Sequence, residues 1–176
     1  MPKPQDKYLF DSSVFIQAKN IHYRFGFCGG FWDWVKAGHG AGLFFSCKKV
    51  QAELNKGEDK DECKAWAKGL PTGFFVPDMA DARVMQAYKD VIKWAEGSKH
   101  YLPAAKKEFA GADEADAFLV AVAKAHSYTI VSQELPNPEK KNRIPLPNAA
   151  DEFKVKTIYV YDLLSKHAAS TFQLKP

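Results

Sequence analysis

The chain has 176 residues, of which 46% are hydrophobic and 26% charged, and its formal net charge is +4. This length suits one sizeable domain and is short for two, and the composition is that of an ordinary globular protein. The mild positive charge permits a polyanionic partner without requiring one, and since only three of the basic residues are arginines, it suits contacts with a phosphate backbone better than the reading of base edges.

Cys28, Cys47 and Cys63 are odd in number and widely spaced, and nothing around them resembles a zinc knuckle or a disulfide framework. The first residues, Met1 to Lys7, lack the apolar core of a signal peptide. No apolar run approaches the ~20 residues that span a bilayer. We therefore expect a cytoplasmic protein with no membrane partner.

The apolar run Tyr8–Phe10 is followed by Asp11 and by two small hydroxyl residues, Ser12 and Ser13. This order predicts a buried strand, an acid at its carboxyl end and a turn into a short helix that continues to Asn20. Asp11 is a candidate for site chemistry, because ligands of open α/β sheets bind beyond the carboxyl ends of the strands. The alternative is that a short polar residue caps the helix, and Ser12 and Ser13 are the better capping candidates.

The insert at about residues 21–42 begins with a segment, residues 21–35, that is dense in aromatic side chains and broken by glycines. The pattern predicts a loop in its first half and a helix in its second. Packing in the core is the favoured interpretation of these rings. The alternative is a stacking platform for nucleobases on Tyr23, Phe25 or Trp32.

The rest of the chain alternates strands with helices. We expect strands at Leu43–Ser46, Tyr128–Val131 (the third parallel strand) and Lys156–Val160, with an extended piece at Phe74–Pro77. We expect helices at Lys48–Asn55, Asp59–Lys68, Asp78–Glu96, from Pro103, at Asp116–Ala123 and at Tyr161–His167. Residues 135–150 read as a loop rich in Pro and Lys, and a tail at about residues 168–176 should fray. This alternation predicts a three-layer α/β/α sandwich with a mostly parallel sheet, formed by a single domain over residues 1–176.

Acidic residues fall at comparable places in this architecture, namely Asp11, Glu53, Asp116 and Glu134. In a parallel sheet these places meet at the carboxyl edge of the strands. Carboxylates repel one another unless a cation lies between them, and oxygen ligands suit Mg²⁺ or Mn²⁺. Such an ion can activate water and stabilise the oxygens of a phosphodiester. The alternative for each acid is a plain helix or loop charge, which for Asp116 the helix dipole would favour.

Several segments resemble the PIN-domain nucleases. Leu9–Ile16 is similar to the strand-one pattern of that family, an apolar pair followed by Asp, a small pair and an apolar residue. Ala115–Ala121 resembles its Asp-Ala-apolar-Ala helix start, and Ile130–Glu134 resembles its strand that ends in Ser or Thr, any residue and an acid. Gly30–Trp34 and Arg143–Pro145 are similar to a prokaryotic PIN-like subfamily labelled as a domain of unknown function. Toxin ribonucleases of the superfamily are more distant.

The resemblance implies a metal-dependent endoribonuclease that acts on single-stranded RNA with Mg²⁺ or Mn²⁺, often as the toxin of a toxin–antitoxin pair. Carried over to this chain, it makes Asp11, Glu53, Asp116 and Glu134 the catalytic metal ligands, with Asp113, Ser132 and Ser12 in support. Besides RNA, an antitoxin protein and a second copy of the chain are the expected partners. The chain departs from the family in having Glu134 where Asp is common and in the aromatic residues 21–35.

Basic and aromatic side chains around these acids are expected to hold the RNA backbone. The candidates are Tyr23, Arg24, Lys48, Lys49, Lys140, Lys141 and Arg143.

Other functions are also compatible with an acid at the end of the first strand. A nucleic-acid or protein-binding module that keeps the fold without turnover would be favoured by a missing acid, and none is missing. A phosphatase of the haloacid-dehalogenase type requires a second Asp two residues after Asp11, where Ser13 stands. A receiver domain requires a pair of acids before its phosphorylated Asp, where only Asp6 is acidic.

Overall fold

The structure is a computed structural model that describes residues 6–168. Within this range, five strands form one sheet in the order β3-β2-β1-β4-β5, with parallel pairing throughout. The strands are β1 (Tyr8–Phe10), β2 (Phe44–Cys47), β3 (Phe75–Val76), β4 (Thr129–Ser132) and β5 (Thr157–Tyr159). The helices are α1 (Ser12–Gln17), the π-helix η1 (Ala18–His22), α2 (Gly29–Gly40), α3 (Lys48–Asn55), α4 (Glu62–Lys68), α5 (Ala82–Gly97), α6 (Pro103–Phe109), α7 (Asp116–His126), α8 (Leu146–Glu152) and α9 (Val160–His167).

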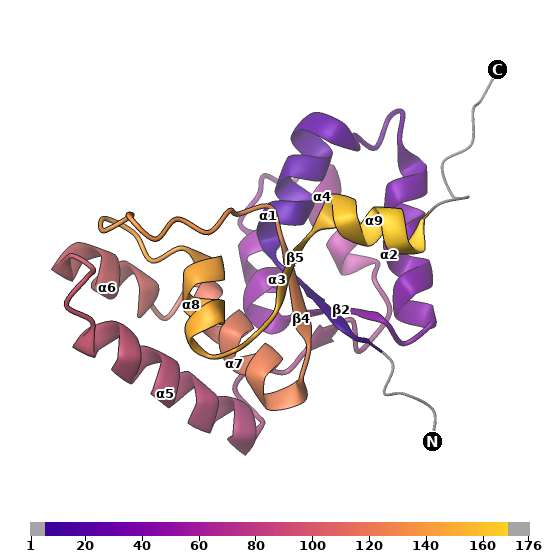
Figure 1. Ribbon diagram of the computed structural model, residues 1–176. Helices are drawn as coiled ribbons and strands as arrows, with labels where there is room; N and C mark the ends of the chain where they lie inside the picture. Colours follow the sequence, from indigo (N-terminus) through magenta and orange to yellow (C-terminus); the bar gives the residue numbers. More distant parts are fainter. Residues whose placement is uncertain (1–5, 169–176) are drawn as a thin grey trace.

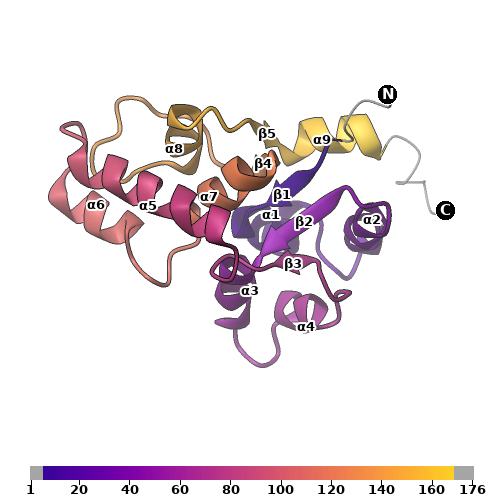
Figure 2. The ribbon, with the colours of Figure 1, turned by 90° about the horizontal axis from the view of Figure 1, so that it is seen from below.

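Helices cover both faces of the sheet. In Figure 1, and in the view from below in Figure 2, α5, α6 and α7 lie to one side of the strands and α2 and α4 to the other. Helix α7 packs against α5 and against strands β2 and β4. On the opposite face, the Trp34 ring of α2 lies 4.7 Å from the Phe44 ring of β2, and its Nε1 donates to the His167 carbonyl of α9 at 3.1 Å. The expected three-layer α/β/α sandwich is confirmed.

Strand β1 lies in the middle of the sheet and is buried on both of its faces. Tyr8, Leu9 and Phe10 are each at most 3% exposed, as expected for an apolar run in a parallel strand covered by helices. The Tyr8 and Phe10 rings lie 6.0 and 5.2 Å from the Phe44 ring on the α2 face, and by alternation Leu9 points to the other face. The next residue, Asp11, is therefore carried into the interior.

The aromatic segment packs in the core, as the favoured interpretation predicts. Phe31, Trp32 and Trp34 are buried. The Trp32 ring lies 4.0 Å from the Phe25 ring, and its Nε1 donates to the Tyr23 carbonyl at 2.7 Å. Trp32 is therefore not an open stacking surface, and Tyr23, which stacks on Phe31 at 4.6 Å, is partly buried.

The loop predicted for the first half of this segment is found at residues 23–28 and is wrong only for Ile21 and His22, while the helix predicted for the second half is confirmed. The helix after β1 continues as η1 through His22, and α2 already begins at Gly29. The Tyr23 N–H donates to the Ala18 carbonyl at 2.8 Å, so backbone bonding extends the helical path beyond Asn20.

The predicted helix over Asp78–Glu96 begins later than expected. Asp78 is buried and accepts a hydrogen bond from the Lys49 N–H at 2.6 Å, which ties it to the start of α3. Helix α5 begins at Ala82, because the Asp81 carboxylate accepts from the Arg83 N–H at 2.8 Å and caps it.

Two further assignments change. The loop predicted for residues 135–150 contains the start of α8, where Pro145 and Pro147 stand beside Leu146, in keeping with the preference of proline for the first turn of a helix. The extended piece near Phe75 pairs with β2 as strand β3, so the strand at Thr129–Ser132 is fourth in chain order.

Two remaining expectations concern the C-terminal tail and membrane-spanning helices. Ala168, the first residue of the tail predicted to fray, is buried and donates to the Leu164 carbonyl at 2.7 Å. The rest of that tail lies outside the described residues. Among residues 6–168, no helix is both long enough and apolar enough to cross a membrane.

Candidate active site

The order of the strands creates a switch point between β1 and β4. The chain passes from β1 to β2 and β3 on one side and then crosses to β4 and β5 on the other. Crevices at the carboxyl ends of strands that flank such a point are the usual binding places of open α/β sheets. The Asp11 N–H donates to the Val131 carbonyl at 2.9 Å, so the residue after β1 is held directly against β4.

Asp11 is 4% exposed and is surrounded by hydroxyl groups. Its Oδ2 accepts from Ser13 Oγ at 2.5 Å and from Ser132 Oγ at 3.0 Å, and its Oδ1 accepts from Ser12 Oγ at 3.4 Å. Burial raises the pKa of Asp11, the Ser13 and Ser132 hydroxyls oppose that rise, and the charge of Glu134 adds to it. A nearby cation would offset the cost of ionising this buried carboxyl, so Asp11 is a candidate cation ligand.

The capping interpretation of this stretch is wrong. Asp11 stands at the N-cap position of α1, but its side chain makes no capping hydrogen bond to the helix. The Ser12 and Ser13 hydroxyls point to the Asp11 carboxylate instead of capping the helix. Ser13 is a site residue that the sequence interpretation missed, and the signal for it was present in its position two residues after the acid.

Ser132 shapes the turn that follows β4. Its Oγ accepts from the Glu134 N–H at 3.1 Å, while the neighbouring Gln133 N–H donates to Ser13 Oγ at 3.2 Å. The hydroxyl that contacts Asp11 therefore also sets the direction of the chain toward Glu134. The supporting role of Ser132 in a metal site stays a prediction.

Glu53 connects α3 to the start of α7. Its Oε1 accepts from the Ala115 N–H at 3.1 Å, immediately before Asp116 opens the helix. Burial raises the pKa of Glu53; the Ser12 hydroxyl and the Ala115 N–H oppose the rise, and the charge of Asp11 adds to it. Glu53 is thus close enough to Asp11 to sense its charge, and it also positions Asp116.

Arg143 places a guanidinium among the acids. Its Nη2 lies 2.8 Å from Glu134 Oε1 and 3.4 Å from Asp116 Oδ2, and its Nε lies 4.0 Å from Glu108 Oε1. The other oxygen of Glu134, Oε2, accepts from the Leu146 N–H at 3.2 Å. A residue expected to contact RNA therefore pairs with the acidic site, and its contact with RNA stays a prediction.

The pKa of Asp116 is affected by the other three acids and by Arg143. Burial raises its pKa well above the ordinary value of 3.8, the charges of Asp11 and Glu134 raise it further, Arg143 opposes the rise, and Glu53 adds to it. The four acids named from the sequence thus lie near enough for their charges to interact, although they come from separate segments of the chain.

These shifts predict how the stability of the metal-free protein depends on pH. Because the folded state holds protons on Asp11, Glu53 and Asp116 more tightly than the unfolded state, the free energy of unfolding should fall as the pH rises above their ordinary pKa values of 3.8 and 4.5. Thermal unfolding with a chelator present should therefore give a higher midpoint at about pH 5 than at about pH 8. Asp116→Asn should flatten this dependence, and a midpoint that rises with pH over this range would contradict the expectation.

The donor set can be compared with the needs of a metal ion. In the described part of the chain, no three Asp, Glu, His or Cys side chains are grouped so as to hold a metal ion as they stand. The acids nevertheless supply only oxygen donors, which suits Mg²⁺ or Mn²⁺, and a single guanidinium leaves part of their charge uncompensated. The oxygen donors of these acids suit a divalent cation, and in this structure Arg143 pairs with two of the acids, Asp116 and Glu134.

The other expected residues lie at varying distances from this chemistry. Asp113 is exposed in the turn before α7, and no contact joins it to the acids in the described structure. Lys48 and Lys49 begin α3, the helix that carries Glu53; Lys49 Nζ donates to the Ala112 carbonyl at 2.5 Å.

The basic residues outside α3 fall into two groups. The carbonyls of Lys140 and Lys141 accept hydrogen bonds from His100 Nε2 at 3.0 Å and from the Leu102 N–H at 2.9 Å, which fastens the loop before α8 to the α5–α6 connection. Arg24 is exposed beyond η1, and its Nε donates to the Asn20 carbonyl at 3.0 Å.

Asp78 is an acid at the carboxyl end of β3 that the sequence interpretation placed inside a helix. Its contact with Lys49 N–H gives it the structural role of binding the first turn of α3. The signal that could have found it is the same as for Asp11, a carboxylate shortly after an apolar run.

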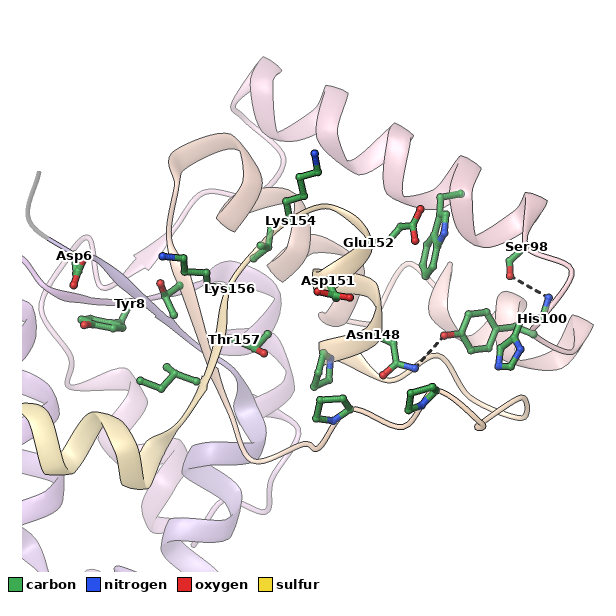
Figure 3. A pocket seen from close by; sticks show the side chains of 18 of the residues that line it. Asp6, Tyr8, Ser98, His100, Asn148, Asp151, Glu152, Lys154, Lys156 and Thr157 are labelled. Carbon is green, nitrogen blue, oxygen red and sulfur yellow. Dashed lines mark hydrogen bonds between the residues drawn. The ribbon is translucent and has the colours of Figure 1, made fainter.

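A cavity of about 1050 Å³ lies away from the acids. Figure 3 shows it between Tyr8 of β1 and Thr157 of β5 on one side and, on the other, Asn148 of α8 and His100 of the α5–α6 connection. Its lining mixes Asp and Glu with Lys, and none of the acids of the switch point lines it. We therefore place the candidate site at Asp11, Glu53, Asp116 and Glu134 and not at this cavity.

Comparison with known proteins shows the family to which the chain belongs. Residues 8–171 match the family described as Domain of unknown function (DUF4411). A search of curated proteins finds no match. The matched residues cover nearly the whole chain and include Asp11, Glu53, Asp116 and Glu134, so the chain belongs to the family described as Domain of unknown function (DUF4411).

Proposed function

We propose that the chain is a PIN-like endoribonuclease that cleaves single-stranded RNA with Mg²⁺ or Mn²⁺. The observation that supports this most is the meeting of carboxylates from separate segments near the switch point of a parallel sheet, where Asp11, Glu53 and Glu134 each raise the pKa of another of these acids. Structural ion pairs tend to alternate in sign, whereas here acids outnumber the single guanidinium. Such an excess is typical of a site that binds a cation.

Asp11, Glu53, Asp116 and Glu134 are the residues that would hold the ion. When bound, a divalent cation supplies the positive charge that stabilises the attacking and leaving oxygens of a phosphodiester. The Ser13 and Ser132 hydroxyls keep the Asp11 carboxylate in one orientation. Lys48, exposed at the start of α3, is available to a phosphate of the RNA on the same edge of the sheet.

The partners follow from the same proposal. RNA is the substrate, and the net charge of +4 is compatible with contacts to its phosphate backbone. The resemblance to PIN-domain nucleases suggests in addition an antitoxin protein and a second copy of the chain.

Purified protein with Mn²⁺ should cut an unstructured RNA oligonucleotide, and excess chelator should stop the cleavage. Calorimetric titration of Mn²⁺ without RNA should show binding at millimolar concentration or below, because clustered carboxylates gain most from a divalent ion. Absence of both cleavage and binding would contradict the proposal.

The second candidate is a binding module with the same fold and little turnover. The ion pairs of Arg143 with Glu134 and Asp116 favour it, since they compensate part of the acidic charge without a metal. RNA binding that needs no divalent ion, together with no Mn²⁺ heat signal, would support this candidate over the nuclease.

A further inference from the structure

We propose that Arg143 is the resident counter-ion of the acidic site, and that a divalent cation binds in competition with its guanidinium. This inference rests on the proposed function, because it concerns the metal that the nuclease would use. The inference assigns to Arg143 the role of setting how strongly this site binds the metal. In the metal-free protein, Arg143 Nη2 lies between Glu134 Oε1 and Asp116 Oδ2, at 2.8 and 3.4 Å.

The hydrogen bonds of Glu134 make competition necessary. Its Oε2 accepts from the Leu146 N–H at 3.2 Å, and its Oε1 contacts Arg143. Both oxygens are therefore occupied by protein donors. A cation on Oε1 would stand beside the guanidinium, and two like charges on one oxygen repel each other. Glu134 can become a metal ligand at low cost only when Arg143 leaves it.

Asp116 is held less firmly by the same group. Its Oδ2 is 3.4 Å from Arg143 Nη2, at the long end for a hydrogen bond, and its Oδ1 has no hydrogen-bond partner among the described residues. Asp116 therefore presents one carboxylate oxygen to a cation without first losing a hydrogen bond, and its other oxygen is held only by the long contact with Arg143.

Arg143 is built to move without unfolding its loop. Its side chain is 42% exposed, so release into water costs little, as for other partly exposed ion pairs. The backbone around it is fastened independently: the Lys141 carbonyl accepts from Leu102, and Ile144 is buried. Rotation of one side chain is then enough to exchange the guanidinium for a metal.

The test is a calorimetric titration of Mn²⁺ into the wild-type chain, Arg143→Gln and Arg83→Gln, at low salt and without RNA. Arg83 is the matched control, because it also pairs with a carboxylate, Asp81 Oδ2 at 3.3 Å, but lies on α5. We expect Arg143→Gln to bind Mn²⁺ about tenfold more tightly than the wild type, within the usual range for coupled equilibria. Arg83→Gln should bind as the wild type does.

A second readout guards against a variant that folds poorly. Arg143→Lys keeps a charge but loses the planar fork, and it should bind Mn²⁺ with an affinity between those of the wild type and Arg143→Gln. The rise in unfolding temperature on adding Mn²⁺ should be larger for both Arg143 variants than for the wild type.

The outcomes separate this inference from the proposed function. If the wild type and the Arg143 variants bind Mn²⁺ equally, or the variants bind it more weakly, competition is overturned while the metal site stands. If no protein binds Mn²⁺ at millimolar concentration, the inference and the proposed nuclease both fail.

Discussion

Asp11→Asn should abolish Mn²⁺-dependent cleavage of single-stranded RNA, with a fall in rate on the order of 10³-fold or more. Losing a metal ligand removes several kcal/mol of transition-state stabilisation, and each ~1.4 kcal/mol corresponds to a factor of about ten in rate. Asp11 is the most deeply buried of the four acids and is bound by two hydroxyls through one oxygen, so a neutral amide cannot supply the same charge to a cation. Initial rates on one RNA oligonucleotide, with wild type and variant purified in parallel, measure the effect.

The matched control is Asp33→Asn, which makes the same chemical change on the exposed side of α2. It should cleave as the wild type does. The Asp11→Asn protein should remain folded, because burial disfavours the charge that the substitution removes, and the Ser13 and Ser132 hydroxyls can donate or accept. Equal cleavage by wild type and Asp11→Asn would refute the assignment of Asp11.

Gly38→Ala should lower the midpoint of thermal unfolding by about 10 °C. A Cβ at this position would lie 1.9 Å from Cδ2 and 2.2 Å from Cε2 of Phe44, so the ring has to move. Phe44 is 1% exposed and packs 4.7 Å from Trp34 and 5.2 Å from Phe10, which leaves it little room. Overpacking of this kind costs up to about 3 kcal/mol, and in a chain of this size each kcal/mol shifts the midpoint by roughly 2–4 °C.

Gly40→Ala is the control for this substitution. It lies in the same helix, and a Cβ there meets nothing within 4 Å. Because alanine favours helix more than glycine does, this variant should be as stable as the wild type or slightly more stable. Circular dichroism melts of the two variants make the comparison, and similar midpoints would show that the α2–β2 contact tolerates the extra methyl group.

The strands and the places of the acids could be predicted from the sequence because both depend on local patterns. A continuous apolar run such as Tyr8–Phe10 indicates a strand buried on two faces wherever it lies in the chain. An acid directly after such a run stands at the carboxyl end of the sheet, as Asp11 does. The long apolar stretch of α7 likewise places Asp116 at a helix start that faces the interior.

The limits of two helices, α5 and α8, depend on contacts between distant segments of the chain. The start of α5 depends on Asp78 being drawn to the first turn of α3, which no periodicity near Asp78 encodes. Helix α8 follows from the burial of Leu146 and Ala149 beneath the loop, where the prolines alone indicated a loop.

The sequence by itself therefore determined a parallel α/β sandwich and predicted which acids follow its strands, because strand alternation and strand ends are local properties of the chain. Only the tertiary structure decided what surrounds those acids. Ser13 became a partner of Asp11 because the turn after β1 directs its hydroxyl inward, and Asp113 remained outside because the turn before α7 points it to water. Arg143 reached Glu134 and Asp116 because the loop of residues 133–145 folds back toward the carboxyl end of β4. Its path depends on contacts with distant segments, such as the hydrogen bond from the Leu102 N–H to the Lys141 carbonyl.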